Sequence, residues 1–473
     1  VLGNAYDTRY DLLHRPVSVQ VPNPAGGSPL VSTIGYASTH VGWQVTTTDP
    51  QGRETLVEHD YLGRAFRTTL PAATTGGQRP VYVTGYDADG LVSGGIDAAG
   101  TTSVLTYNHQ GSLASVLEPY INGSHPTTSY IYSSDGLLQS VTDPLGRVTS
   151  YSYDAGGRLV TQTAPDPDAS GPQLASTQSY VYDALGDVLA STDSLGHTSR
   201  VAYDARLRPI LSTDPANYQT AMSYDVFGNV LSVTDAKANT TTYTYDRWDR
   251  NYIEAQGSDA RTVLLDGLGN VRHATDRDGR DIRFEFDDLY QLTREVWLNA
   301  SDQDIREFVY TYDTVGNLLS VADNFIDHAT QARTTASDTL QFVYDDLDQL
   351  QLERSVNPLV GVSTVLDRDY DLRGLETALK ANLGGVIVGD SVSGGVKDFV
   401  NQYAHDVLGR LTSVTQASQS GGNSVAPKLA TSQYDAANQL TDLRRYSSTS
   451  AYSTYLEVHS RFGYDGAGRL QSI

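Results

Sequence analysis

The chain has 473 residues and a formal net charge of −23, a length typical of roughly three domains at ~150 residues each. Apolar residues make up 39% and charged residues 19% of the chain, which excludes a disordered polyelectrolyte. No run approaches the ~18 apolar residues of a membrane helix, the negative charge disfavours nucleic acid as a partner, and the absence of cysteine excludes disulfides and thiolate metal sites.

A short motif, Tyr-Asp followed by Gly three residues after the Asp, recurs along the chain, and a fixed repeat of this kind determines a fold. Degenerate copies fill the gaps between six full copies, giving 18 units over residues 1–473. The units are most regular over 182–312, and those from 182 to 286 begin every 20 or 21 residues. We therefore expect one continuous repeat array. Because the chain opens at Val1 without a signal segment and its only methionine is Met222, we also expect it to be a piece of a longer protein.

One unit, residues 224–246, predicts the local structure of the others. Asp225 is placed to bond the backbone two residues on, and Gly228 can supply the positive φ of a tight turn. The segments 230–234 and 240–245 are rich in β-branched and aromatic residues, which favour strands. Each unit is therefore expected to be a two-stranded hairpin, with an Asp-x-x-Gly turn at either end.

The number of units predicts the overall architecture. Eighteen hairpins contain about 36 strands, or roughly 170 Å of sheet at ~4.8 Å per strand. A twisted antiparallel sheet of more than ~10 strands has to curl, split or close. The expected fold class is all-β, a long antiparallel β-hairpin repeat ribbon curled into a spiral, a hollow shell or a superhelix.

Longer steps between units indicate insertions. The segments 71–80, 164–172 and 416–427 are rich in Gly, Ser and Pro, which is typical of surface loops. An extra hairpin is expected within 371–403, where the repeat is blurred. No helical stripe of 12 or more residues is found, although 329–338 could form a short turn.

The units resemble the YD repeats of Rhs proteins, a group that includes shell-forming components of insecticidal toxin complexes and the teneurin ectodomains. The strings that carry the resemblance are YDVFGNVLSVTD, YDTVGNLLSVAD, YDALGDVLASTD, YDAGGRLVTQTA and HDVLGRLTSVTQ. The resemblance covers nearly the whole chain. It implies a ribbon that spirals into a hollow shell, which encloses a C-terminal effector in the toxins and supports adhesion or recognition in other members.

The resemblance also implies architectural roles for the repeat residues, with Tyr packing between strands and with Asp and Gly shaping the turns. These residues are Tyr153, Asp154, Gly157, Tyr182, Asp183, Gly186, Tyr224, Asp225, Gly228, Asn229, Tyr312, Asp313, Gly316, Tyr464, Asp465 and Gly468.

The chain departs from the family pattern at one point. The shells commonly close with an Asp-Pro-x-Gly-Leu-like segment, where self-cleavage can release the cargo. The nearest strings here, at 143–146 and 49–52, are ordinary repeat turns, and no cargo domain is recognised after Ile473. The resemblance therefore implies the wall of such an assembly and identifies no effector.

Catalytic and metal-binding patterns are not apparent. The chain has neither a Gly-x-Ser-x-Gly elbow nor a phosphate-binding Gly-x-x-x-x-Gly-Lys loop, and most Asp residues recur with the repeat. His59 and His405 occupy the Tyr position of degenerate units, where packing explains them. We expect no enzyme activity, no cofactor and no metal. One acidic cluster superficially resembles a calcium loop but lacks its ligand order, so we interpret it as a solvated face and leave weak calcium binding open: Asp276, Asp278, Asp281, Glu285, Asp287 and Asp288.

The function that the sequence favours is a non-enzymatic structural scaffold, extracellular or on the cell surface, forming the wall of a shell. One alternative is a self-assembling extracellular fibre or sheath subunit. Another is a carbohydrate-binding or adhesion module, because Trp43, Trp248 and Trp297, with the tail residues Tyr446, Tyr452 and Tyr455, could stack on sugars. The expected partners are further repeats of the same parent chain, other copies of the chain, an enclosed effector domain or a surface glycan.

Overall fold

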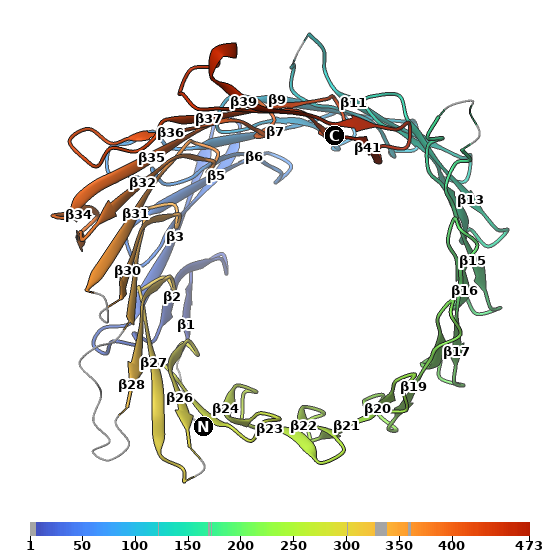
Figure 1. The fold of residues 1–473 in the computed structure, drawn as a ribbon, viewed down its shortest axis with the longest axis horizontal. Coiled ribbons are helices and arrows are strands. Elements are labelled where there is room, and N and C mark those ends of the chain that lie inside the picture. The colour runs from blue at the N-terminus through green and yellow to red at the C-terminus, as the bar shows by residue number, and fades with distance from the viewer. Residues whose placement is uncertain are drawn as a thin grey trace.

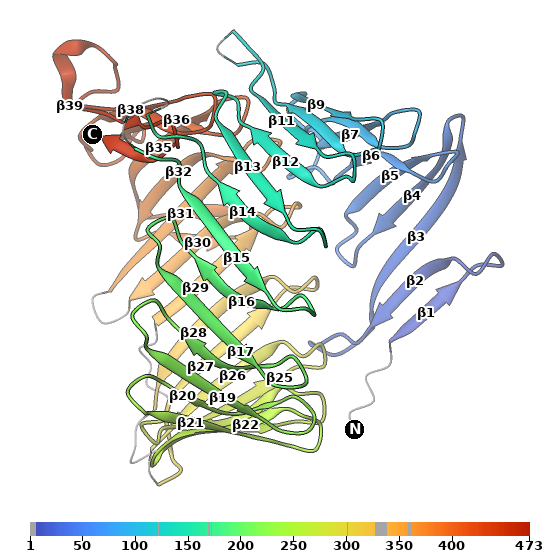
Figure 2. The same cartoon turned by 90° about the vertical axis from the view of Figure 1, so that its right-hand side faces the viewer.

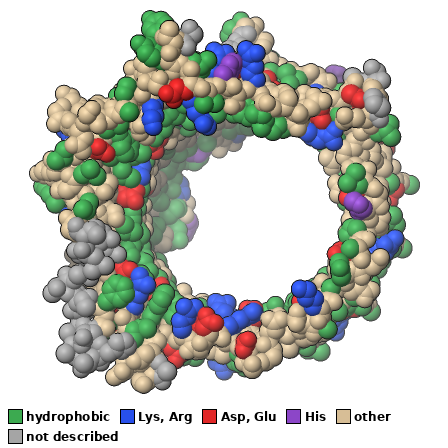
Figure 3. Space-filling model, in the orientation of Figure 1, with side chains coloured by type: hydrophobic (Ala, Val, Ile, Leu, Met, Phe, Trp, Pro, Cys, Tyr) green, Lys and Arg blue, Asp and Glu red, His purple; other side chains and the backbone are tan. Residues whose placement is uncertain are grey.

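The computed structural model describes residues 6–121, 123–168, 171, 173–299, 301–326, 338–357 and 361–473. Its strands join into one 37-stranded antiparallel sheet, in which each strand pairs with its neighbours along the chain. The sheet curls around an open centre (Figure 1), and the space-filling view shows that side chains do not fill this opening (Figure 3). The predicted all-β ribbon, curled into a hollow form, is therefore confirmed.

Most strands have five to ten residues. The first group comprises β1 Asp7–Tyr10, β2 Pro16–Val21, β3 Leu30–Thr39, β4 Gly42–Thr48, β5 Glu54–Asp60, β6 Ala65–Thr69, β7 Val81–Tyr86, β8 Val92–Ile96, β9 Thr102–Tyr107, β10 Leu113–Leu117, β11 Thr127–Tyr132, β12 Leu138–Thr142, β13 Val148–Tyr153 and β14 Leu159–Thr163. The second comprises β15 Thr177–Tyr182, β16 Val188–Thr192, β17 Thr198–Tyr203, β18 Pro209–Thr213, β19 Gln219–Tyr224, β20 Val230–Thr234, β21 Thr240–Tyr245, β22 Asn251–Gln256, β23 Asp259–Leu265, β24 Val271–Thr275, β25 Asp281–Phe286 and β26 Leu292–Leu298. The third comprises β27 Asp304–Tyr312, β28 Leu318–Phe325, β29 Asp338–Tyr344, β30 Leu350–Asn357, β31 Val362–Tyr370, β32 Glu376–Leu383, β33 Val386–Val388, β34 Ser391–Ser393, β35 Val396–His405, β36 Leu411–Ser418, β37 Lys428–Tyr434, β38 Leu440–Tyr446, β39 Leu456–Arg461, β40 Gly463–Tyr464 and β41 Leu470–Ser472.

Two short pairs lie outside the main sheet. Within 371–403, β33 pairs with β34 as an extra hairpin, and β40 pairs with β41 near the C-terminal end. One 3-10 helix, Ser453–Tyr455, lies in the loop before β39. Of the predicted turn at 329–338, residues 329–337 lie outside the described residues. Within the described ranges, no helix is long and apolar enough to cross a membrane.

Two kinds of turn alternate along the ribbon, so they lie on its opposite edges. A YD turn follows the Tyr-Asp position inside a unit and occupies what we call the YD edge; a link turn or loop joins one unit to the next on the link edge. The YD turns are 11–15, 60–64, 87–91, 108–112, 133–137, 154–158, 183–187, 204–208, 225–229, 246–250, 266–270, 287–291, 313–317, 345–349, 371–375, 406–410, 435–439 and 465–469. The tight link turns are 49–53, 97–101, 143–147, 193–197, 214–218, 235–239, 256–259 and 276–280, and the Asn299 N–H donates to the Gln303 carbonyl in another.

A β-bulge accompanies each YD turn. Tyr224 pairs with Val230, whereas the preceding Ser223 pairs with Ser232, so Leu231 is an extra residue on the second strand. The pairing across the following link turn is regular, with Thr234 opposite Thr240. Because a bulge bends its strand and increases the local twist, a bulge repeated in every unit curls the ribbon in one direction.

The ribbon passes around the central opening more than once. Strands β26–β39 lie along the same arc as β3–β14 and are displaced from them along the axis of the opening, whereas β15–β22 form a single layer (Figures 1 and 2). The thin wall has few fully buried side chains, and they concentrate where the strands are longest: Val296, Leu352 and Val365 are at most 1% exposed. The fold therefore brings residues that are far apart in sequence together where the first circuit of the ribbon (β3–β14) meets the second circuit (β26–β39). We call this line of contact the inter-turn seam.

Candidate functional site

The Asp that begins most YD turns organises the turn backbone; Asn108 and Ser133 take its place in two of them. In turn 225–229, Asp225 Oδ1 accepts hydrogen bonds from the backbone N–H groups of Phe227, Gly228 and Asn229 at 2.8, 2.8 and 2.9 Å. Asn229 Nδ2 donates to Asp225 Oδ2 at 2.9 Å. Gly228 has a φ of 106°, a conformation that residues with a Cβ rarely adopt. One carboxylate thereby satisfies three turn amides that would otherwise face solvent.

In most units the Tyr that precedes the YD turn reaches back to the previous unit. Tyr245 Oη donates to the Val230 carbonyl at 2.9 Å, and Val230 is the residue that pairs with Tyr224 at the preceding bulge. The same bond recurs for the Tyr residues named from the sequence, at 2.8–2.9 Å: Tyr153 to Leu138, Tyr182 to Leu159, Tyr224 to Pro209, Tyr312 to Leu292 and Tyr464 to Leu440. The tyrosine hydroxyl therefore connects successive hairpins.

An arginine at the fifth position of many turns makes a second connection, which the sequence interpretation missed. Arg208 Nε donates to Asp204 Oδ2 at 2.8 Å, and Arg208 Nη1 donates to the Asp225 carbonyl of the next YD turn at 2.8 Å. Its guanidinium also lies over the ring of Tyr224, 4.6 Å from the centroid. Arg158, Arg250 and Arg410 bond the next YD turn in the same way. An Arg four residues after the turn Asp recurs in all four turns, with Gly before it in 154–158 and 406–410, and this spacing was the signal that could have identified the residue.

The turn contacts change the acidity of the aspartates. The side-chain hydrogen bond from Arg208 lowers the pKa of Asp204 to about 2. The backbone N–H of Arg158 lowers the pKa of Asp154. Burial has the opposite effect at Asp345 and Asp367, where desolvation raises the pKa. The carboxylates of Asp204 and Asp154 are therefore charged at neutral pH and serve as fixed acceptors.

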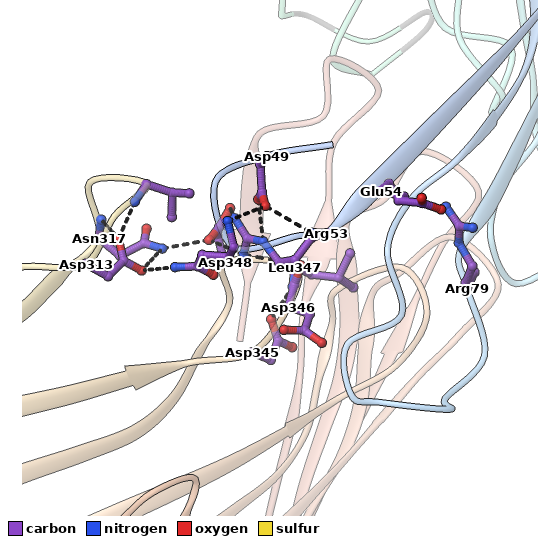
Figure 4. A network of polar contacts seen from close by, with 12 residues as sticks. Asp49, Arg53, Glu54, Arg79, Asp313, Asn317, Asp345, Asp346, Leu347 and Asp348 are labelled. Carbon is purple, nitrogen blue, oxygen red and sulfur yellow. Dashed lines mark hydrogen bonds and ion pairs between the residues drawn. The ribbon is translucent and has the colours of Figure 1, made fainter. Parts of the chain in front are cut away.

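The inter-turn seam contains an ion-pair network (Figure 4). Arg53, in link turn 49–53, binds Asp49 Oδ2 through Nε at 2.6 Å and Asp348 Oδ1 through Nη1 at 2.7 Å. Asp348 Oδ1 also accepts from Asn317 Nδ2 at 2.6 Å. The Arg53 side chain is only 10% exposed. Although burial opposes it, the hydrogen bonds that Arg53 donates to Asp348 and Asp49 raise the pKa of Arg53.

Further seam contacts have the same arrangement: the link edge of the ribbon's first circuit around the opening meets the YD edge of its second circuit. Gln51 Nε2 donates to Asp313 Oδ2 at 3.0 Å, and Arg147 Nη1 donates to Gln439 Oε1 at 2.7 Å. The insertion loops take part, because the Asp346 N–H donates to the Ala73 carbonyl and the Gly466 N–H to the Pro167 carbonyl. A cavity of about 460 Å³ lies between the loop around Ala73 and the second circuit of the ribbon.

The structure does not join the three tryptophans into one surface. Trp43 on β4 stacks on His59, with ring centroids 4.0 Å apart. Trp297 on β26 lies against Phe308 and donates through Nε1 to Glu295. Trp248 is 57% exposed in its YD turn, with two arginine side chains over the ring. Tyr446 is buried, whereas Tyr452 and Tyr455 are exposed. Sugar stacking at these positions stays a prediction.

The acidic cluster lies around link turn 276–280 and β25. Asp276 binds Arg280 within its turn, and Glu285 binds Arg294. Among the described residues, no group of three or more His, Asp or Glu side chains is arranged to hold a metal ion. His405 occupies the Tyr position of its unit, opposite Leu411.

Comparison with known protein families and sequences identifies the repeat. The RHS repeat family model matches residues 132–169, 203–240 and 224–250. The double-stranded DNA deaminase toxin A of Burkholderia cenocepacia is 31% identical over 141 residues, a match covering 27% of this chain and 10% of the toxin. The chain thus spans about a tenth of this curated relative.

Solved structures show the same fold at 13% sequence identity. The crystal structure of TcdB2-TccC3-Cdc42 superimposes with a TM-score of 0.66, covering 99% of this chain and 27% of that chain. The corresponding values are 0.65, 97% and 28% for TcdB2-TccC3 without its hypervariable C-terminal region. They are 0.64, 98% and 27% for a Photorhabdus luminescens Tc holotoxin pore. At this level of identity the likeness establishes the fold alone.

Proposed function

We propose that the chain forms part of the wall of a hollow extracellular shell that encloses a toxin-type polypeptide effector, because it carries repeats that match the RHS repeat family model and has the fold of the Tc structures. In general terms, the chain is a shell-like structural scaffold. The observation that supports enclosure of an effector is the seam. The ribbon surrounds an open lumen and its second circuit then binds its first circuit through Asp348 and Arg53, which are 295 residues apart. A ribbon that seals against itself makes a continuous wall.

The contents of the lumen follow from charge and from the relatives. A net charge of −23 opposes the binding of polynucleotides, because affinity for phosphate backbones depends on Lys and Arg. A polypeptide is therefore the favoured content. The Burkholderia relative is named as a toxin, and one of the structures with the same fold is a Tc holotoxin pore, which supports an effector of the toxin class.

The proposal is tested by cryo-electron microscopy of the protein isolated from its source with whatever polypeptide is continuous with it or bound to it. We expect hollow particles with additional density inside the lumen, and mass spectrometry of the denatured particles should identify the enclosed segment. Particles whose lumen is empty in every preparation, or whose extra polypeptide lies on the outer surface, would contradict enclosure while leaving the scaffold role in place.

A further inference from the structure

The cavity of about 460 Å³ at the inter-turn seam is formed by parts of both circuits of the ribbon. The insertion loop 71–80 of the first circuit makes one side, and the YD turns 345–349 and 371–375 of the second circuit make the other. The loop is anchored to the second circuit, because the Asp346 N–H donates to the Ala73 carbonyl at 3.1 Å. The volume lies within the range of ~300–1,000 Å³ that is usual for ligand sites.

The strand residues that line this cavity point toward the lumen. The hairpin β33–β34 lies on the outer side of the wall, farther from the central opening than β31 (Figure 1). Ser363 Oγ and Arg354 Nε donate to the Gly385 carbonyl at the base of this hairpin, at 3.0 and 3.2 Å, so their side chains lie on the outer face. Because side chains alternate between the two faces of a strand, Arg368 on β31 and Gln351 on β30 lie on the lumen face.

Arg368 brings to the cavity a hydrogen-bond donor that no residue in the described ranges satisfies. Its Nη2 atom donates to Glu353 Oε2 at 2.8 Å, whereas its Nη1 atom is buried and has no hydrogen-bond partner there. The side chain as a whole is only 16% exposed. A buried donor without an acceptor is costly, so the cavity is matched to a ligand that supplies an acceptor at this position.

The charges around the cavity favour a neutral acceptor. The charge of Arg368 is already balanced by Glu353, and the Asp345 carboxylate has no basic partner in the part of the chain that the structure describes. The two other carboxylates at the cavity are paired with bases, Asp369 with Lys380 and Asp371 with Arg373. An anionic ligand would therefore be repelled by Asp345, and a cationic ligand by Arg368.

Amide side chains add further uncommitted polar groups to the lining. Gln78 from the insertion loop and Gln351 from β30 line the cavity, and their side chains make no hydrogen bond within the described residues. A primary amide offers both an N–H donor and a carbonyl acceptor, the two groups that a peptide bond also carries. A polypeptide backbone can therefore pair with these amides and place a carbonyl oxygen against Arg368 Nη1.

We propose that this cavity holds an extended segment of the polypeptide enclosed by the shell, with Arg368 Nη1 donating to one of its backbone carbonyl oxygens. The inference rests on the proposed function and adds to it the place where the wall contacts its content. Because recognition through backbone groups does not depend on the side chains of the segment, the same wall can hold effectors of different sequence.

The test is photo-cross-linking in particles that contain the enclosed polypeptide. The photoreactive amino acid p-benzoylphenylalanine takes the place of Gln78 at the cavity, of Tyr243 on β21, or of the exposed Val388 on the outer hairpin. Tyr243 lies two residues before the Tyr of its YD turn, as Arg368 does in its own unit, so it shares the lumen face but lies away from the cavity. We expect the enclosed polypeptide to be cross-linked from positions 78 and 243 and not from position 388, and mass spectrometry should map the product of position 78 to one segment.

Arg368→Lys tests the assigned donor, because it keeps a positive charge beside Glu353 but removes Nη1. It should lower the cross-linking yield at position 78 by about threefold or more, since a hydrogen bond to a charged group is lost, and leave the yield at position 243 unchanged. The matched control is Arg354→Lys, the same change on the outer face, which should alter neither yield. Circular dichroism checks that both variants are folded.

The outcomes separate this inference from the proposed function. Cross-links from position 243 but none from position 78, or equal effects of Arg368→Lys and Arg354→Lys, would overturn the binding role of the cavity and leave enclosure in place. The absence of cross-links from both lumen positions would contradict enclosure itself, and this inference with it.

Discussion

At the scale of single residues, the YD turn depends on one carboxylate and one backbone conformation. Asp225 gathers three backbone N–H groups, and the fourth position of the turn has a positive φ. Degenerate turns place other residues there, for example Leu207 at a φ of 63° and Asp348 at 61°. An L-residue in this region costs ~1–2 kcal/mol, so glycine at the fourth position is favoured for a local reason.

Replacing Gly228 by alanine should destabilise its hairpin by about 1–2 kcal/mol. No atom lies within 4 Å of the added Cβ, so the cost is conformational and not steric. The matched control is Gly267→Ala, at a turn position with an ordinary φ and equally open surroundings. Because a repeat protein opens locally, hydrogen exchange is measured in the hairpin that carries each substitution, β19–β20 for Gly228→Ala and β23–β24 for Gly267→Ala. Equal effects of the two substitutions would contradict the assigned role of Gly228.

Acid should weaken the turns through their aspartates. The pKa of Asp204 is about 2 in the folded chain and 3.8 as its ordinary value, so its stabilising contribution is present above pH ~3.8 and is lost as the pH falls toward ~2. Asp345 and Asp367 have raised pKa values and act in the opposite direction. Thermal melting should therefore separate Asp204→Asn from the wild type at pH 7 and no longer at pH 2; an unchanged difference at both pH values would contradict this linkage.

At the scale of the element, a hairpin is tied to its neighbours by side chains as well as by the sheet ladder. The Tyr hydroxyl bonds a carbonyl at the preceding bulge, and the turn Arg bonds a carbonyl in the next turn. Both acceptors lie beside turns, where the ladder ends. These two bonds therefore hold the angle between hairpins, which sets the curl of the ribbon.

Tyr245→Phe should reduce the local stability of β20 and β21 by about 0.5–1.5 kcal/mol, because the Val230 carbonyl loses its side-chain donor. Tyr243→Phe, on the same strand, removes a hydroxyl that makes no such bond in the described part of the chain. Hydrogen exchange at Val230 and its neighbours compares the two variants. A loss of the same size in both would show that ring packing, and not the hydroxyl bond, connects the hairpins.

Sequence reasoning was strongest where the information is local. Except for Tyr6-Asp7, whose Asp opens β1, the Asp of each Tyr-Asp dipeptide begins a turn in which its N–H donates to the carbonyl of the fifth residue. The number of predicted hairpins led to a curled all-β ribbon. The bulge at Leu231 was not foreseen, because strict alternation of side chains does not reveal an extra residue. The inter-unit role of Arg208 was missed because its acceptor, the Asp225 carbonyl, is a backbone atom that no side-chain motif marks.

At the scale of the whole molecule, the seam is a product of accumulated curvature. Each unit adds a similar bend, so the residue that meets Arg53 depends on the summed geometry of all the strands between positions 53 and 348 and on the insertion loops among them. No short string encodes that distance. Arg53 and Asp348 are recognisable only as a turn arginine and a turn aspartate, and the curl of the ribbon brings them together. Long-range contacts of this kind therefore could not be predicted from the sequence motifs.

The seam pair should nevertheless have a measurable coupling energy. In a double-mutant cycle of Arg53→Ala and Asp348→Ala, we expect about 1–2 kcal/mol, because hydrogen bonds to charged groups are strong when buried and the Arg53 side chain is 10% exposed. The value stays moderate because Asp348 is 46% exposed, and solvent screens such pairs. Hydrogen exchange of turns 49–53 and 345–349 reports the opening of the seam directly.

The control cycle is Arg9→Ala with Asp7→Ala, an ion pair in which both side chains are more than half exposed and for which coupling of about 0–0.5 kcal/mol is expected. If the Arg53–Asp348 coupling is no larger than that of the control, this pair does not hold the two circuits of the ribbon together, and the closed wall must depend on the other seam contacts, such as Arg147–Gln439 and the loop contact around Ala73. A larger coupling means that two side chains far apart in sequence fix the diameter of the lumen, because any change in curvature between them would pull the pair apart.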